Sequence, residues 1–336
     1  MNIGVPDLLA SSRLARDMAQ VNRNLERASR EVSTGLRDDP VAAAGGDPAR
    51  LYALDRDLAA IDTRLTNLQL GAVRGEVIQS SLQRVQDLVS ELGVELAAAA
   101  ERRDIGAADR YAGTARSAFE SVVNTLNSSF ADRSLFAGAA TDGAALADPG
   151  VILAEVAARV AAAPDAATAL TAIDDYFFND PAGFDTTGYL GSTSDAPATE
   201  IADGERIALA TRADNDAIRG ALAALAAAVI GAERAAPALS EVERLELLGS
   251  AASAGIAARD EVINLRATIG VAEERIETAQ VRTEAEKTVL ELSRNRFVLR
   301  DQFEAAAEFT ALETQLQSIF TITSRLSSLS LSGFLR

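Results

Sequence analysis

The chain has 336 residues, a formal net charge of −17 and no Cys, His or Trp, and 31 of its 32 basic residues are Arg. Without Cys it can form neither disulfides nor thiolate metal sites, and without His it lacks the side chain best suited to proton transfer near neutral pH. Catalysis by carboxylates stays open, but the composition favours a protein that packs or binds over an enzyme.

The negative charge is concentrated in the middle of the chain. Residues 141–205 hold twelve Asp or Glu against one Arg, whereas residues 1–37 hold six Arg against four acids. An acidic middle disfavours nucleic acid as a partner, because phosphate binding needs a basic footprint. It predicts a solvated surface instead. The sequence has no apolar run of about 18 residues, so we expect no membrane span.

The N-terminal segment predicts a helix over residues 7–33. Ser11, Met18, Leu25 and Val32 recur at a spacing of seven, with Leu14, Val21 and Ala28 as a companion row. Such a stripe is a seam that one helix buries against another. Gly35 follows as a residue that can adopt the left-handed conformation ending a helix. The charged residues of this segment leave no apolar block for a cleaved signal peptide.

The next segment predicts a loop and then two helices. Asp47 followed by Pro48 is typical of a helix start, and apolar residues at a spacing of seven continue to about residue 101. A further helix is predicted over residues 107–129. The loop acids Asp38, Asp39 and Asp47 could in principle bind a cation, but capping and turn formation explain them better.

The middle of the chain predicts a smaller α+β domain over residues 140–235. Asp142-Gly143 and Asp203-Gly204 are hairpin-type turn signals. The aromatic residues at 176–178 could bind a ligand or form the core of this domain, and we favour the core.

The C-terminal part predicts a long helix that begins with a capping box, Ser240 and Glu243. Its apolar row shifts by one position at Phe297–Val298, where we expect a break in packing. A second heptad row then follows, consisting of Val298, Ala305, Leu312, Ile319 and Leu326, flanked by Phe309 and Leu316.

Two heptad seams at opposite ends of the chain predict that the ends meet. No acid follows Glu313, and the apolar residues beyond it are more numerous than one partner helix can cover. We therefore expect this surface to be buried between subunits rather than within a self-contained bundle.

The predicted fold is mainly α, with long antiparallel helices from both chain ends forming a coiled-coil bundle, and with a smaller α+β middle domain. The expected divisions are an N-terminal assembly helix at 1–40, bundle segments at 41–139 and 236–296, the outward-facing variable domain at 140–235, and a C-terminal assembly helix at 297–336.

Residues 7–140 and 240–336 resemble the bacterial flagellin family. Val32-Ser33-Thr34-Gly35-Leu36-Arg37 is similar to the family's segment after its first helix. A second set of residues resembles the family's C-terminal pattern. It consists of Asp301, Glu304, Ala306, Ala307, Phe309, Thr310 and Leu312, with the ending Leu329-Ser330-Leu331. The segment at 133–139, Arg-Ser-Leu-Phe-Ala-Gly-Ala, is similar to that of the hook–filament junction members of the family, and the short middle insert agrees with this.

One local difference from the family concerns the loop after the first helix. The family usually places several residues between its Ser-Thr-Gly motif and an Asp-Asp-Pro turn, whereas Asp38-Asp39-Pro40 follows at once here. Either Asp47-Pro48 is the counterpart of that turn or the loop is rearranged.

The resemblance implies an extracellular structural subunit of the flagellum, exported unfolded by the type III apparatus without a cleaved signal peptide. Its terminal helices would form an inner tube, with the middle domain facing outward. The implied partners are other copies of the chain in the same layer, hook-associated protein 1, flagellin and an export chaperone, with no cofactor, nucleic acid or membrane.

We predict no catalytic, cofactor-binding or metal-binding residues. The predicted assembly interface consists of apolar residues of the two terminal helices: Leu14, Met18, Val21, Leu25, Val32, Phe309, Leu312, Leu316, Ile319, Leu326 and Leu331. The alternatives are flagellin itself, the filament subunit, and less closely a cytoplasmic coiled-coil scaffold.

Overall fold

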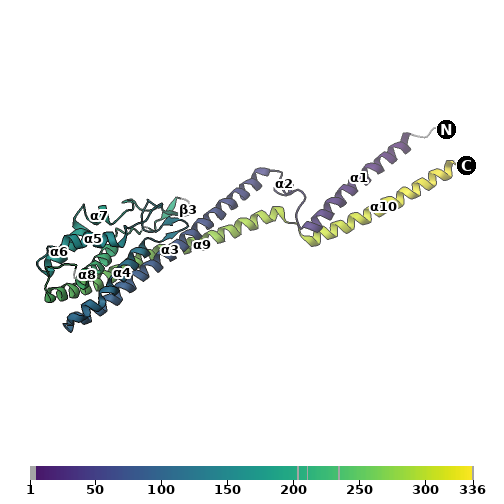
Figure 1. The fold of residues 1–336 in the computed structure, drawn as a ribbon. Helices are drawn as coiled ribbons and strands as arrows, with labels where there is room; N and C mark the ends of the chain where they lie inside the picture. Colours follow the sequence, from purple (N-terminus) through teal and green to yellow (C-terminus); the bar gives the residue numbers. More distant parts are fainter. Residues whose placement is uncertain (1–4, 203, 210, 234, 335–336) are drawn as a thin grey trace. The chain divides into compact units, whose positions relative to one another are not determined.

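The computed structural model describes residues 5–202, 204–209, 211–233 and 235–334, and the chain divides into two compact units. We call residues 1–62 with 284–336 the helix-pair unit and residues 63–283 the core unit. Both are mainly helical, which confirms the predicted fold class (Figure 1). The division falls inside two long helices, α3 (Pro48–Glu101) and α9 (Glu241–Val298).

In the helix-pair unit, α1 (Val5–Thr34) and α10 (Gln302–Phe334) lie side by side and antiparallel (Figure 1), so the prediction that the two chain ends meet is confirmed. The first helix ends as predicted. Gly35 has φ +70°, and its N–H donates to the carbonyl of Glu31 at 2.9 Å.

Both Asp-Pro pairs of the following loop begin a helix. Asp39 Oδ1 accepts from Ala42 N at 2.9 Å at the start of the short α2 (Pro40–Ala43). Asp47 Oδ1 accepts from Ala49 N at 2.9 Å at the start of α3, as predicted. In each pair the Asp side chain satisfies a free N–H of the first turn, and Pro supplies a φ already suited to the helix.

Polar pairs connect α3 and α9 within the helix-pair unit. Asp55 contacts Arg294 at 2.6 Å, and Asp62 contacts Lys287 at 2.7 Å. The guanidinium of Arg50 lies 4.7 Å from the ring centre of Phe297. Exposed pairs of this kind stabilise a helix contact by less than about 1 kcal/mol each, so they define its register more than its strength.

In the core unit, α3 and α9 are joined by α4 (Ile105–Leu126) and α8 (Asp216–Ala232). Helix α8 is rich in alanine and buried on nearly every side, as expected for a helix that is apolar all round. Its last turn is closed by Arg244 of α9, whose Nε donates to Gly231 O at 2.9 Å. The capping box at Ser240 and Glu243 is confirmed by hydrogen bonds of 2.7 and 3.3 Å.

The core unit contains two small hairpins. One pairs β1 (Ser129–Phe130) with β2 (Arg133–Ser134), and Ala131 and Asp132 form its turn with φ of 51° and 59°. The predicted hairpin at Asp142-Gly143 was wrong. The described residues there form a turn without strand pairing. Local turn chemistry does not explain this outcome, because Asp-Gly adopts the left-handed conformation of a tight hairpin more readily than Ala-Asp does.

The second hairpin was predicted correctly. It pairs β3 (Thr199–Ala202) with β4 (Glu205–Ile207), and Gly204 has φ +77°.

Short helices fill the rest of the middle segment: α5 (Pro149–Val160), α6 (Ala166–Asp174) and α7 (Phe184–Thr187), with a π-helical turn, η1 (Asp175–Asn179), after α6. Tyr176 and Phe177 are buried against Phe184, so the core interpretation is confirmed for these two. It was wrong for Phe178, which is 41% exposed because the π-turn directs it outward.

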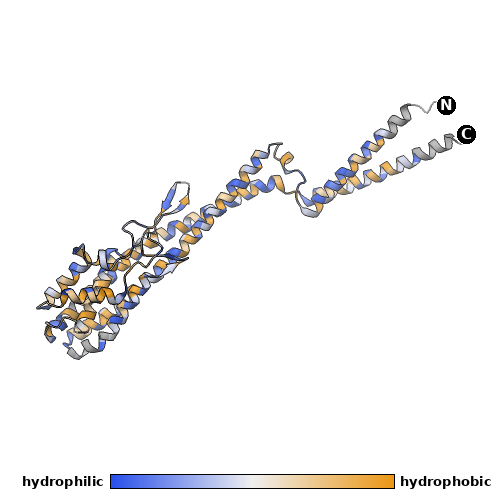
Figure 2. Ribbon diagram, turned by 45° about the horizontal axis from the view of Figure 1, so that its top comes forward, coloured by the Kyte–Doolittle hydropathy of each residue, from blue (hydrophilic) through white to orange (hydrophobic). Residues whose placement is uncertain are grey.

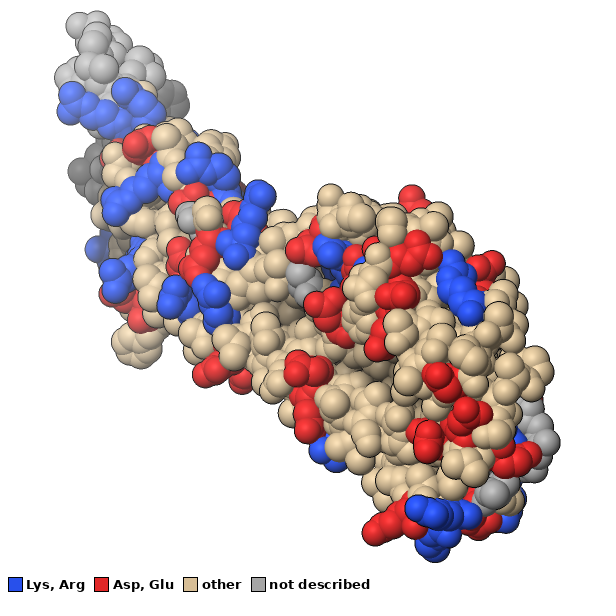
Figure 3. Space-filling model, turned by 90° about the vertical axis from the view of Figure 1, so that its left-hand side faces the viewer, with Lys and Arg blue, Asp and Glu red and all other residues tan. Residues whose placement is uncertain are grey.

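A single hydrophobic core joins residues of the middle segment to α3, α4 and α9 within the core unit. Apolar residues gather there, whereas apolar and polar residues alternate along α1 and α10 (Figure 2). The predicted boundaries at 140 and 235 therefore do not coincide with an edge of this core. On the face of the core unit seen in Figure 3, acidic side chains are spread out and separated by uncharged ones.

The segment at 133–139 is a structural part of this core. Phe136 O accepts from Ala213 N, and Ala137 O accepts from Ser192 N, both at 2.9 Å. Gly138 has φ +62°, and a Cβ on it would lie 2.5 Å from Ser194 O, so only glycine fits there.

Candidate assembly interface

The seam between α1 and α10 is built from small and half-buried apolar side chains. Ala28 and Ala305 are the most buried of the described side chains, with Val21 next at 5% exposure. Half-buried along the two helices are Leu14, Met18, Leu25, Val32, Phe309, Leu312, Leu316 and Ile319. The side chains of Leu326 and Leu331 lie outside the described residues.

Ala28 and Ala305 were part of the heptad rows but were not selected as interface residues. Their small side chains let the two backbones approach closely at the end of the pair where α1 finishes and α10 begins. The signal was therefore present in the spacing, but large apolar residues were favoured over small ones.

The chain crosses from α9 to α10 at a backbone contact with the end of α1. Arg37 N donates to Val298 O at 2.9 Å, and Arg300 N donates to Gly35 O at 3.0 Å. The predicted break at Phe297–Val298 is confirmed, since α9 ends at Val298 and α10 begins at Gln302. Asp301 Oδ1 accepts from Phe303 N at 2.8 Å and caps the new helix.

A group of charged side chains surrounds this crossing. Arg300 contacts Glu31 at 3.4 Å and Glu308 at 2.8 Å, and Glu308 also contacts Arg27 at 3.1 Å. Glu31 is itself buried, and its Oε1 accepts from Asp38 N at 3.0 Å. The network thus connects both terminal helices to the loop between α1 and α2. Our sequence interpretation missed it, although Glu31 lies beside the apolar row, where paired helices often place charges.

Asp38, one of the loop acids considered as a cation ligand, is paired with Arg30. Its two carboxylate oxygens accept from Arg30 Nε and Nη2 at 2.9 and 3.0 Å. This hydrogen bonding lowers the pKa of Asp38 and raises the pKa of Arg30. The part of the chain that the structure describes has no group of three or more His, Cys, Asp or Glu side chains arranged to hold a metal.

Pairing with α1 leaves large apolar side chains of α10 in contact with solvent. Phe303 is 86% exposed, Phe320 53% and Ile322 51%. Between residues 303 and 322 the polar side chains are mainly Ser, Thr and Gln, so few charged side chains lie beside the exposed apolar ones. Apolar residues exposed at this density on a single helix are typical of a surface that another chain covers.

Within the described residues, no helix is both long enough and apolar enough to cross a membrane. The interface just described is a pair of amphipathic helices with an uncovered apolar side.

Comparisons with known proteins agree with this arrangement. Residues 256–335 match the model of the bacterial flagellin C-terminal helical region. No curated protein sequence matches the chain. A solved structure from Vibrio parahaemolyticus, described as that of a flagellar hook-associated protein, is 13% identical with a TM-score of 0.52. The match covers 74% of this chain and 97% of the Vibrio chain, and at this identity it shows a shared fold.

The family match covers α10 and the later part of α9, the same helices that supply the C-terminal side of the seam and the uncovered apolar residues. Residues 256–335 therefore resemble the C-terminal helical region of bacterial flagellins, and the chain shares the fold of the Vibrio protein.

Proposed function

We propose that this protein is the subunit that joins the flagellar hook to the filament and assembles through its terminal helices. The observation that carries the assembly part is the α1–α10 pair, whose C-terminal helix exposes Phe303, Phe320 and Ile322 after pairing. Burying such side chains between subunits is favourable at about 25 cal/mol per Å² of apolar surface removed from water.

Two observations favour the junction over the filament. Residues 134–138, within the segment that resembles junction members of the family, are buried and hydrogen-bonded in the core unit. The fold likeness to a hook-associated protein extends over 74% of the chain and supports the same reading.

The remaining parts of the proposal concern partners and export. A junction subunit would contact copies of itself within its layer, hook-associated protein 1 on the cell side and flagellin on the other. Head-to-tail contacts between unlike surfaces build helical assemblies of this kind. Export would proceed through the type III apparatus with a chaperone that shields the terminal helices, and no signal peptide would be cleaved.

Flagellin itself is the second candidate, because the family model matches a region that flagellins carry. A flagellin polymerises on itself without limit, whereas a junction subunit accepts a different neighbour at each end and stops after a thin layer. Specificity of that kind is a difference in affinity between the correct and the incorrect neighbours.

The two candidates are separated by finding where the protein lies along the flagellum. The chain has no Cys, so Gly143→Cys introduces a single thiol, at an exposed turn where an added Cβ meets nothing within 4 Å. Labelling intact flagella with a maleimide dye should give one narrow band at the base of the filament. A strain lacking the protein should still build hooks and should release flagellin monomers into the medium.

Labelling along the whole filament would identify the protein as a flagellin. Retention of the labelled protein inside the cell, with motility unaffected by its deletion, would instead favour the cytoplasmic scaffold. The unmodified chain treated with the same dye is the matched control, since it contains no thiol.

A further inference from the structure

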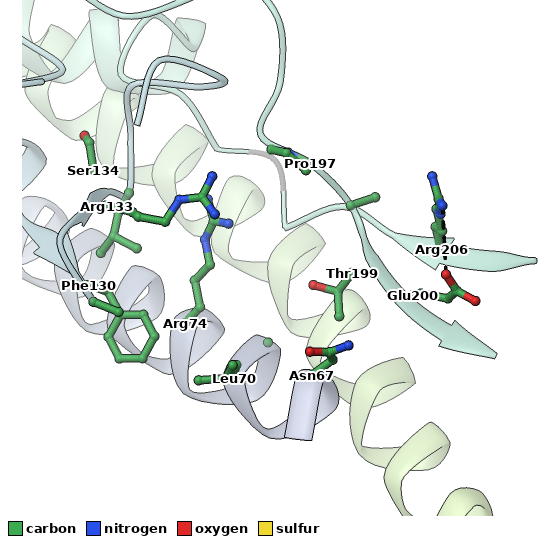
Figure 4. Close-up of a pocket in the computed structure, with 14 residues that line it drawn as sticks. Asn67, Leu70, Arg74, Phe130, Arg133, Ser134, Pro197, Thr199, Glu200 and Arg206 are labelled. Atoms are coloured by element: carbon green, nitrogen blue, oxygen red, sulfur yellow. Dashed lines mark ion pairs between the residues drawn. The ribbon is translucent and has the colours of Figure 1, made fainter. Parts of the chain in front are cut away.

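A groove of about 530 Å³ opens on the core unit between α3, the β1–β2 hairpin and the segment leading into β3 (Figure 4). Leu70, Phe130 and Pro197 contribute apolar surface to it. A volume of this size, lined by apolar surface and a few polar groups, is typical of a small-molecule site.

Two arginines converge in this groove. Figure 4 shows Arg74, from α3, and Arg133, from β2, extending toward each other. No acidic partner is seen for either among the described residues. Arg74 Nε is buried without a hydrogen-bond partner, and so is the hydroxyl of the neighbouring Ser134.

The acidic side chain that lines the groove is paired with another arginine, not with Arg74 or Arg133. Glu200, the one acidic side chain among the described residues lining the groove, contacts Arg206 at 3.8 Å. Figure 4 shows this pair on the strands, away from the two arginines. Several other arginines of the core unit do have acidic partners, as in the contact of 2.5 Å between Arg116 and Glu233.

Electrostatics makes this arrangement costly for the chain alone. Burial lowers the pKa of the Arg74 guanidinium, and the nearby positive charge of Arg133 lowers it further. Arg74 is half-buried and Arg133 is exposed, so the cost lies mainly at the buried Nε of Arg74, whose lost hydration no hydrogen bond replaces. An anion between the two arginines would offset both the desolvation of Arg74 and the repulsion between Arg74 and Arg133.

We propose that this groove binds an organic carboxylate, with its oxygens held by Arg74 and Arg133 and its apolar part against Leu70, Phe130 and Pro197. The planar guanidinium presents parallel N–H donors that match the two oxygens of a carboxylate. The apolar lining favours an organic anion over an inorganic one.

The carboxylate has two possible sources, a free molecule or an Asp or Glu side chain of a second copy of this chain. The second source has a basis in the composition, because residues 141–205 carry twelve acids and would be abundant wherever copies assemble. Both sources present the same group to the same two arginines.

The test uses the full chain at a concentration where sedimentation shows a monomer, titrated with benzoate and with its neutral analogue benzamide. Benzoate should shift the Arg74 Nε–Hε signal in the NMR spectrum in a saturable way, and benzamide should not. Arg74→Gln and Arg133→Gln should each weaken benzoate binding by about tenfold or more, since each removes half of the charged fork. Arg206→Gln, on the rim, should bind benzoate like the wild type.

Stability in the absence of benzoate distinguishes a binding role from a structural one. Arg74→Gln removes an uncompensated charge, so its melting temperature should equal or exceed that of the wild type. A clear decrease, with benzoate binding unchanged, would overturn the proposal.

A second experiment identifies the source of the carboxylate by sedimentation at low salt and at a higher protein concentration. Self-association that is suppressed by benzoate and lost in Arg74→Gln would assign the carboxylate to a second copy. Benzoate binding without self-association would assign the carboxylate to a free molecule. Equal binding of benzoate and benzamide would overturn the proposal. So would the absence of both benzoate binding and Arg74-dependent association.

Discussion

Glu31 of α1 and Arg300, between α9 and α10, form an ion pair at 3.4 Å in which the two side chains are only 10% and 18% exposed. The pair joins the two ends of the chain at the point where α1 finishes and α10 begins. Glu31 also accepts the Asp38 N–H, so one carboxylate connects α1, the link between α9 and α10, and the loop before α2.

Glu31→Ala should weaken the helix-pair unit. The substitution leaves the half-buried Arg300 without one partner and the Asp38 N–H without its acceptor, which costs about 1–3 kcal/mol per subunit. We expect a lower temperature of depolymerisation for assembled protein, measured by light scattering. Glu26→Ala, at an exposed position of the same helix, is the matched control and should depolymerise like the wild type. Equal temperatures for Glu31→Ala and the wild type would show that the pair contributes nothing.

Leu316→Asp should abolish assembly while the core unit stays folded. Leu316 is half-buried in the seam, and an assembled neighbour would bury it further. A buried, unpaired carboxylate costs several kcal/mol, and repetition around a ring multiplies the defect. Electron microscopy of flagella and a motility assay measure the outcome, and Ile319→Asp should behave in the same way.

The control for this prediction is Asp148→Asn. Asp148 caps α5 by accepting from Gly150 N at 2.8 Å, and Asn caps a helix about as well as Asp does. This variant should assemble normally. Normal motility of Leu316→Asp would show that the seam is not the assembly interface.

The free monomer should lose its ends to a protease. Among the described side chains of α1 and α10, only Val21, Ala28, Glu31 and Ala305 are buried, which is little apolar burial to offset the entropy of ordering two long helices. Limited proteolysis should remove roughly the first 30–40 and the last 35–40 residues and leave a stable central fragment that contains the core unit. Mass spectrometry of the fragments checks the boundaries, and protease-resistant ends in a verified monomer would contradict the expectation.

Assemblies should become sensitive to acid through Asp38. Its pKa is lowered from the ordinary 3.8 by the Arg30 hydrogen bonds, so its stabilising contribution is complete above that value and is lost as the pH falls through the lowered pKa. We expect acid-induced depolymerisation of the wild type to steepen below about pH 4. Asp38→Asn removes this titration and should give a shallower dependence on pH, measured by scattering from pH 5 to pH 2.

Gly138→Ala should destabilise the core unit. The residue has φ +62°, and a Cβ would lie 2.5 and 2.7 Å from the carbonyl oxygens of Ser194 and Ser192. The backbone strain alone costs about 1–3 kcal/mol, and the two contacts add to it. Thermal unfolding of the full chain measures the loss. Gly143→Ala, which meets nothing within 4 Å, should unfold like the wild type.

Local signals in the sequence were sufficient for the long helices and their ends. The Asp47-Pro48 start, the Gly35 stop and the Ser240–Glu243 capping box each satisfy backbone groups within a few residues, so their outcome depends little on the rest of the fold. The shift of the heptad row at Phe297–Val298 likewise predicted the break between α9 and α10, because a change of seam requires a change of partner.

Other features were decided by contacts between distant segments. The first hairpin formed at Ala131-Asp132 rather than at Asp142-Gly143, and Phe178 was directed outward by a π-turn that no local pattern indicates. The Glu31–Arg300 pair and the convergence of Arg74 with Arg133 unite residues far apart in the chain. Periodicity and capping determine which residues form a helix and which side is apolar, but only the tertiary structure determines which charged side chains meet and which are left without a partner, because that depends on where each helix meets its neighbours.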